Sequence, residues 1–334
     1  MLKMIQLVIA FLLISMALPI SVTGKTKLGQ ELMSEASVLI DAKSGQILYE
    51  ENADKKMYPA SITKIVTGIM AIEQGDLTEE VRVSEFATEQ IGTRVYLLED
   101  EKVSLRQLVE GLLINSGNDA GTAIAEHLAG DEEKFAKKMN EFVHELGATN
   151  THFTNPHGLF DEEHYTTALD MAIITQYALK NNTFRDIVST KELEWVGEGW
   201  ETTLYNHHRL LWDYEGTIGV KNGFVSQAGF TLVTAAERDE QAYIAVTLKN
   251  DTAQQSYQDT QRLLDYGFNN YKQIQLDKDE PLIDQGATTY YPMEDTTYAI
   301  RKDMEVDQTI TDDTLVVTTP DESFHYEVEL IQEE

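Results

Sequence analysis

The sequence predicts an α+β fold in which helices pack against an antiparallel β-sheet. Strand-like and helical segments come in blocks: a strand pair within 37–49, helices within 61–179, three strands within 217–249 and a helix over 254–266. Neighbouring strands are separated by short turns, which favours antiparallel pairing. With 334 residues, of which 42% are hydrophobic, the chain is long enough to bury a full-sized core.

The chain is strongly acidic, with 26 basic and 57 acidic residues and a net charge of −31. Nucleic acids and anionic lipid surfaces are therefore poor partners, because binding them relies on clustered Lys and Arg. The acidity fits simple solubility, and it is also compatible with a cationic or neutral substrate or a high-salt habitat. The chain has no cysteine, which excludes disulfides, thiolate metal sites and a cysteine nucleophile.

Residues 1–24 have the pattern of a secretory signal. Lys3 precedes an almost unbroken apolar run from Met4 to Ile20, and small residues follow before Lys25. An uncleaved anchor is the alternative, because the run approaches the roughly 20 residues that span a bilayer. We expect an exported, extracytoplasmic protein.

The first strand pair, within 37–49, turns through Lys43-Ser44-Gly45. The stretch Tyr58–Lys64 follows, with Pro59 suited to a helix start. Ser61 and Lys64 are three residues apart, so on a helix they share one face. A serine in a first turn, beside a lysine whose pKa is lowered by desolvation, is a candidate nucleophile with its own base. The pattern alone is common on surface helices and proves nothing.

Short β-like pieces at 81–83 and 95–97 precede three consecutive helices. The first begins at Ser104, which forms a predicted capping box with Gln107; the second covers 119–128, and the third follows Asp131. Together they predict a helical lobe with Ser116-Gly117-Asn118 on a loop inside it.

Three histidines, His152, His157 and His164, lie near acidic residues within 152–166. Their spacing matches no ligand motif, and a structured turn is favoured over a metal site. A further helix is predicted to open at Thr167 and to run to about residue 179.

The composition changes near residue 275, where a Thr-, Val- and Tyr-rich acidic segment with alternating runs begins. We predict three units: the signal over 1–24, a catalytic domain over 25–272 and a small β-rich domain over 273–334.

Three motifs occur in the order Ser61-Ile62-Thr63-Lys64, Ser116-Gly117-Asn118 and Lys221-Asn222-Gly223. The sequence thereby resembles the serine-type D-alanyl-D-alanine carboxypeptidases, low-molecular-weight penicillin-binding proteins of the S11-like peptidase family. The similarity covers about 35–270, and the C-terminal segment resembles their small β domain. It implies the penicillin-recognising transpeptidase/β-lactamase-like fold. Lys43-Ser44-Gly45 matches the third motif better by letter but precedes Ser61 and lies in a predicted turn.

The resemblance implies a role for each residue of the first two motifs. Ser61 would attack the carbonyl of the penultimate D-alanine, and Lys64 would accept its proton. Ser116 would relay a proton to the departing amine. Asn118 would hold the substrate amide and keep Lys64 aligned. No cofactor or metal is implied.

The third motif differs from the family pattern Lys-Thr-Gly. Lys221 would attract the substrate carboxylate and help to keep Lys64 neutral. Asn222 and Val225 replace hydroxyl-bearing residues that would bind that carboxylate. The backbone N–H groups of Ser61 and Phe224 would form the oxyanion hole, with Gly223 between the lysine and that donor.

The implied function is release of the terminal D-alanine from peptidoglycan stem pentapeptides, with β-lactam antibiotics as covalent inhibitors. The protein would act at the cell wall or the outer face of the cytoplasmic membrane, with peripheral association as an option. The alternatives are a D,D-endopeptidase acting on cross-links and a cell-wall binding protein weakened at Asn222 and Val225. A β-lactamase is disfavoured, because the sequence has no class A Glu-x-x-x-Asn loop between the second and third motifs.

Overall fold

A computed structural model describes residues 28, 31–284, 289–311, 313–320 and 324–333. The predicted signal segment, 1–24, lies outside the described residues. No helix in the described ranges is both long and apolar enough to cross a membrane.

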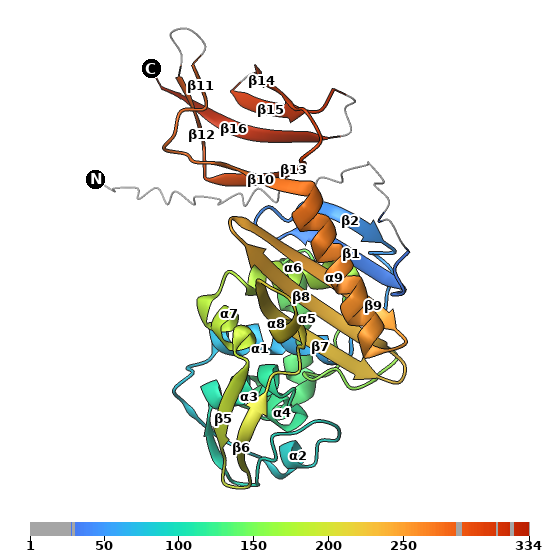
Figure 1. The fold of residues 1–334 in the computed structure, drawn as a ribbon. Coiled ribbons are helices and arrows are strands. Elements are labelled where there is room, and N and C mark those ends of the chain that lie inside the picture. Colours follow the sequence, from blue (N-terminus) through green and yellow to red (C-terminus); the bar gives the residue numbers. More distant parts are fainter. Residues whose placement is uncertain (1–27, 29–30, 285–288, 312, 321–323, 334) are drawn as a thin grey trace, which may run out of the picture.

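The centre of the larger part is a five-stranded antiparallel sheet with the strand order β2-β1-β9-β8-β7 (Figure 1). Its strands are β1 (Ala36–Asp41), β2 (Ile47–Glu51), β7 (Thr217–Val225), β8 (Gly229–Arg238) and β9 (Gln241–Asn250). The sequence predicts all five strands, although β7 extends beyond the expected end at Lys221. That extension carries the third motif along an edge strand.

Helices cover both faces of this sheet, because its central strands alternate between two apolar cores. Val38 and Ile40 pack in the core shared with the helical lobe, whereas Leu39 packs with Leu263 and Leu264 of α9 (Ala253–Asn270). Strand residues point alternately to opposite faces, so one strand serves both cores. Thr252, which precedes the predicted start of this helix at 254, caps α9 with a complete capping box.

The helical lobe lies behind and below the sheet in Figure 1. It comprises η1 (Ala60–Thr63), α1 (Lys64–Gln74), α2 (Glu85–Thr88), α3 (Leu105–Ile114), α4 (Asn118–Ala129), α5 (Glu132–Glu145), α6 (Ala168–Ala178), α7 (Asn182–Ser189) and α8 (Leu210–Asp213). The predicted starts of α5 and α6 are confirmed, because Asp131 and Thr167 each accept from the backbone N–H three residues on.

Two local expectations in this region are wrong or incomplete. Residues 95–97 form no strand, because the N–H groups of Val95 and Leu97 donate to the carboxylate of Asp119 instead. Ser104 caps α3, but the side chain of Gln107 donates to the Val196 carbonyl and does not complete a capping box. The hairpins β3–β4 (Glu80–Arg82, Lys102–Ser104) and β5–β6 (Glu192–Val196, Glu201–Tyr205) flank the lobe.

The C-terminal strands form a β domain at the end of the molecule opposite β5 and β6 (Figure 1). They are β10 (Tyr271–Leu276), β11 (Ile283–Asp284), β12 (Thr289–Pro292), β13 (Thr296–Arg301), β14 (Asp307–Thr311), β15 (Thr314–Thr318) and β16 (His325–Glu333). The predicted boundary between 272 and 273 falls within β10 and stays a prediction. The side-chain amide of Gln46 joins the two parts through a reciprocal pair of 2.9 Å bonds with the backbone of Ala299.

Candidate active site

Ser61 lies in the 3₁₀ turn η1, one turn ahead of the α-helix that begins at Lys64. The sequence predicts Ser61 in the first turn of the α-helix itself, so the structure differs from the prediction in where this helix begins. The reason is the backbone at Ala60, whose φ of +52° is left-handed and redirects the chain before Ser61. Gly158 packs directly on this bend, since a Cβ on Gly158 would lie 1.9 Å from the Ala60 oxygen.

The amine of Lys64 is completely buried and makes three polar contacts. Its Nζ lies 3.1 Å from Ser61 Oγ, 2.7 Å from Asn118 Oδ1 and 2.7 Å from the main-chain oxygen of His157. The amide orientation of Asn118 is defined, because its Nδ2 donates to the Ile91 carbonyl over 2.6 Å. Burial lowers the Lys64 pKa well below its usual value, and the nearby charge of Lys221 lowers it further.

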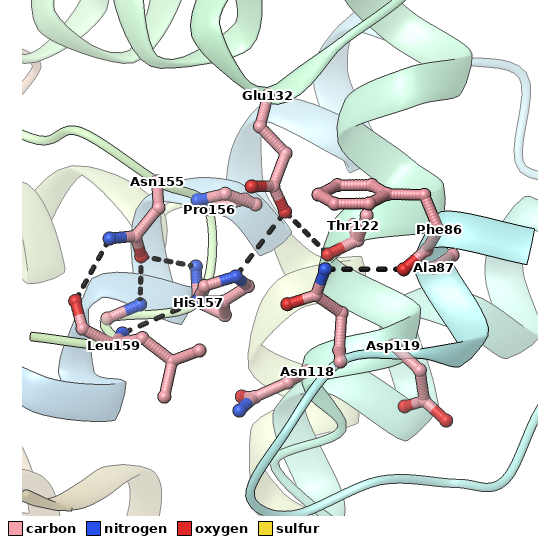
Figure 2. Close-up of polar contacts among 12 residues, drawn as sticks. Phe86, Ala87, Asn118, Asp119, Thr122, Glu132, Asn155, Pro156, His157 and Leu159 are labelled. Carbon is pink, nitrogen blue, oxygen red and sulfur yellow. Dashed lines mark hydrogen bonds and ion pairs between the residues drawn. The ribbon is translucent and has the colours of Figure 1, made fainter.

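The side chain of His157 is held between Leu159 and Glu132 (Figure 2). Its Nδ1 accepts from the Leu159 N–H, so Nε2 carries the proton and faces Glu132 Oε1 at 3.3 Å. The same carboxylate oxygen accepts from Thr122 Oγ1 over 2.5 Å. Burial lowers the pKa of His157, so the ring is neutral at pH 7. Helices α4 and α5 thus fix the residue whose carbonyl contacts Lys64.

His164 supports the same bend from the opposite side. Its Nδ1 accepts from the Thr154 N–H, so its Nε2–H donates to Thr63 Oγ1 over 2.9 Å. Thr63 Oγ1 in turn donates to the Ala60 oxygen. Burial lowers the pKa of His164 to about 3. These histidines are therefore neutral hydrogen-bonding residues of the site, and no group of three metal-ligating side chains occurs within the described ranges.

The second motif lies where α3 passes into α4. Ser116 is buried and has a left-handed φ of +65°, and Asn118 begins α4. The carboxylate of Asp119 accepts from the backbone of Val95 and Leu97, which holds the preceding loop beside Asn118. A local sequence pattern cannot reveal this arrangement, because it joins segments more than twenty residues apart.

The third motif lies on the edge strand β7. Lys221 is 1% exposed, and burial lowers its pKa to about 7. Its Nζ donates to the main-chain oxygen of Asn222 at 3.0 Å and to Asn222 Oδ1 at 3.3 Å. The side-chain oxygen of Asn222 is therefore directed at the lysine. The neighbouring His207 has a pKa of about 4, lowered first by burial and then by the charges of Lys221 and Lys64.

The strand then passes against the backbone of Ser61. A Cβ on Gly223 would lie 2.7 Å from the Ser61 nitrogen and 2.6 Å from Thr231 Oγ1, so only glycine allows this approach. Thr231 Oγ1 donates to the Pro59 oxygen over 2.8 Å, which ties β8 to the chain just before Ser61. Phe224 is 53% exposed and packs against Phe230 with ring centroids 4.5 Å apart.

The structure thus brings Ser61, Lys64 and Asn118 into direct contact and places Gly223 against Ser61. Sequence reasoning did not assign His157 and Glu132 to the site. The turn at 154–159 was visible in the sequence, but the carbonyl that it directs at Lys64 was not.

Comparisons with known proteins agree with this arrangement. The peptidase S11 family, described as D-alanyl-D-alanine carboxypeptidase, matches residues 22–252. The chain is 36% identical over 251 residues to D-alanyl-D-alanine carboxypeptidase DacF of Bacillus subtilis, covering 72% of this chain and 64% of that protein. It is 32% identical over 259 residues to DacD of Escherichia coli, covering 74% and 66%. These matches span slightly less than two thirds of the relatives' own length.

Solved structures show the same fold. Penicillin-binding protein 5 of Haemophilus influenzae has a TM-score of 0.81 at 27% identity and covers 93% of this chain and 100% of its own. The Streptomyces K15 DD-transpeptidase has a TM-score of 0.69 at 29% identity, covering 72% and 98%. The similarity to the first structure includes the C-terminal β domain as well as the sheet and the helical lobe. The chain therefore belongs to the S11 peptidase family of D-alanyl-D-alanine carboxypeptidases.

Proposed function

We propose that this protein is an exported serine D,D-carboxypeptidase that releases the terminal D-alanine of peptidoglycan stem pentapeptides through a Ser61 acyl-enzyme. The observation that carries the proposal is the buried amine of Lys64, which lies 3.1 Å from Ser61 Oγ between two carbonyl oxygens. Penicillin would acylate the same hydroxyl. Acylation at a serine beside a neutral lysine needs neither a cofactor nor a metal.

The first step follows from the hydrogen-bonding capacity of a neutral amine. Such a group has two N–H donors and one lone pair. Asn118 Oδ1 and the His157 oxygen can only accept, so they take both donors. The lone pair is left for the hydroxyl proton of Ser61. Lys64 can therefore remove this proton as Ser61 attacks the carbonyl carbon.

The tetrahedral intermediate would be stabilised by the backbone N–H groups of Ser61 and Phe224. Gly223 supports this role, because it brings β7 against the Ser61 nitrogen. Losing one such donor typically costs about 2.7–4 kcal/mol in the transition state. Ser116 would pass a proton to the departing D-alanine amine, and water would then hydrolyse the ester.

The partner of the site is thus a peptide with a carboxylate next to the scissile bond. Lys221 would attract that carboxylate, although its charge is partial at neutral pH because its pKa is about 7. Asn222 and Val225 supply no hydroxyl for the same group. This departure favours one second candidate, a cell-wall binding protein with little or no peptidase activity.

Intact-protein mass after incubation with a penicillin tests the proposal, with Ser61→Ala as the control. We expect one adduct on the wild type, none on the variant, and release of D-alanine from a peptide that ends in D-Ala-D-Ala. Absence of both adduct and D-alanine would reject the peptidase and leave the binding protein. Adduct formation with cleavage of cross-linked dimers only would identify a D,D-endopeptidase.

A further inference from the structure

A cavity of about 270 Å³ opens beside Tyr58, three residues before the nucleophile. Its walls come from the segment before η1, from the turn that joins β7 to β8 at Gln227 and Ala228, and from Lys249 at the end of β9. None of the residues assigned above to the acyl-transfer site lines it. The cavity is therefore adjacent to the candidate active site but distinct from it.

The cavity has a defined position along the edge strand. Gly223 lies against Ser61, Lys221 precedes it by two residues and Gln227 follows it by four. At about 3.4 Å per residue, Gln227 is at most roughly 14 Å along the chain from Gly223, the residue that packs on the nucleophile. Lys221 and the cavity therefore lie on opposite sides of Ser61 along β7, which is the last strand of the sheet.

An extended peptide can lie along such an edge. If its terminal carboxylate is directed toward Lys221, the part before the scissile bond must run in the other direction, toward Gln227. The cavity is then within reach of a group about three to four residues before the scissile bond. This step rests on the proposed function, because it takes the position of the leaving group from it.

The charge of the cavity is opposite to that of the protein. Three lysines and two glutamates line it, whereas the whole chain has a net charge of −31. Glu35 is bracketed by Lys55 at 2.5 Å and Lys249 at 2.9 Å. Lys56 Nζ instead lies 4.1 Å from the centre of the Tyr165 ring, a cation–π contact that leaves its positive charge in place.

The backbone of the cavity wall is built to hold this arrangement. Lys249 has a left-handed φ of +60°, an unfavourable conformation for a lysine. Gly229, at the start of β8, packs against it, since a Cβ there would lie 3.5 Å from the Lys249 Cα and 2.8 Å from the Asn250 oxygen. The turn that follows β7 is thereby fixed against the lysine that pairs with Glu35.

We propose that this cavity binds a carboxylate of the peptide substrate, carried about three to four residues before the scissile bond, with Lys56 as its principal partner. The ligand is thus an acidic peptide, and the two ends of the substrate are read by two separate cationic positions. An ion pair in this half-enclosed cavity strengthens binding of the acidic peptide at low ionic strength and less so at high salt.

Two synthetic peptides test this subsite. Both end in D-Ala-D-Ala, and they differ only in a glutamate or a glutamine three or four residues before the scissile bond. We expect kcat/KM of the wild type to favour the glutamate peptide by about tenfold, as expected for one charge-assisted hydrogen bond. Lys56→Gln should remove this preference, Lys56→Arg should retain it, and Lys137→Gln, a matched exposed lysine on α5, should leave it as in the wild type.

Equal kcat/KM values for the two peptides in the wild type would overturn the subsite, as would a Lys56→Gln protein that keeps the preference. Penicillin acylation of Ser61 in each variant reports folding and the acyl-transfer site separately. If the wild type forms no acyl-enzyme, calorimetric titration with the same two peptides still decides the question. Tighter binding of the glutamate peptide would then support the subsite although the proposed activity had failed, and equal binding would reject it.

Discussion

Lys64 Nζ donates to the main-chain oxygen of His157 over 2.7 Å, across 93 residues of sequence. Together with Asn118 Oδ1, this carbonyl defines which direction remains open for the lone pair of the amine. That direction is occupied by Ser61 Oγ. The position of one backbone carbonyl therefore decides whether a buried lysine can act as the base for the serine.

Loss of the Glu132 carboxylate should weaken acylation, because Glu132 holds the ring of His157. In Glu132→Ala, His157 Nε2 and Thr122 Oγ1 both lose the carboxylate oxygen that lies 3.3 Å and 2.5 Å from them. We expect penicillin acylation to slow about tenfold and the ascending limb of its pH profile to move. Glu133→Ala is the matched control, since Glu133 pairs with Lys137 on the exposed side of α5. Equal rates for the two variants would show that Glu132 does not position Lys64.

The pH dependence should distinguish the two lysines. Lys221 has a pKa of about 7, so it is a cation below this pH and neutral above it. For a peptide with a free terminal carboxylate, we expect kcat/KM to fall as pH rises through about 7. For a substrate with an amidated terminus, this descending limb should be absent. The ascending limb, which reports loss of the Lys64 proton, should be common to both substrates. Identical profiles would contradict a role of Lys221 in carboxylate binding.

Two left-handed glycines provide a matched test of the bend before Ser61. Gly147 has a φ of +91° with nothing within 4 Å of a Cβ, whereas Gly158 has a φ of +86° with the Ala60 oxygen at 1.9 Å. Gly147→Ala should cost about 1–2 kcal/mol of unfolding free energy and keep the acylation rate. Gly158→Ala should lower the Tm further and slow acylation about 100-fold, because it displaces the nucleophile. Similar effects of the two changes in thermal melts and acylation assays would contradict this account.

Asn222→Thr should improve recognition of a terminal carboxylate. The side-chain oxygen of Asn222 accepts from Lys221 Nζ at 3.3 Å, so only the amide nitrogen of this side chain can donate to an anion. A threonine hydroxyl at this position can donate to the carboxylate. One such bond contributes about 0.5–1.5 kcal/mol, or a rise of up to about tenfold in kcat/KM. The control is Asn222→Val, because valine has the shape of threonine without the hydroxyl. It should show no rise in kcat/KM, and the rate of D-alanine release is measured for both variants. A gain in the valine variant would assign the effect to shape alone.

Several elements were predictable because the interactions that define them are local. Asp131 and Thr167 cap their helices through backbone groups three residues away, and the alternation of the strands within 217–249 is a local pattern. The hairpin β5–β6 was not foreseen. Each of its strands has one buried residue, Trp195 in β5 and Leu204 in β6, and the others are exposed or partly exposed, so the sequence has little apolar alternation there.

The candidate site likewise has a part that local sequence patterns predict and a part that depends on contacts between distant segments. Ser61 and Lys64 are recognisable because residues three apart lie on the same face of one helical turn. Ser116 and Asn118 are recognisable as part of a short motif. Residues 95–97 look like a strand by composition, but the carboxylate of Asp119 takes two of their N–H groups. A backbone segment whose donors are bound by a distant side chain cannot be assigned from propensity alone.

The sequence by itself determined the α+β architecture, the order of the three motifs and the pairing of a serine with a lysine, because each depends on periodicity or on neighbours within one turn. Only the tertiary structure decided that the His157 carbonyl and Asn118 take the two donors of Lys64, and that Gly223 lies against the Ser61 nitrogen. The physical reason is that desolvation and donor–acceptor balance at a buried amine depend on atoms from segments far apart in the chain, which meet only when the core is packed.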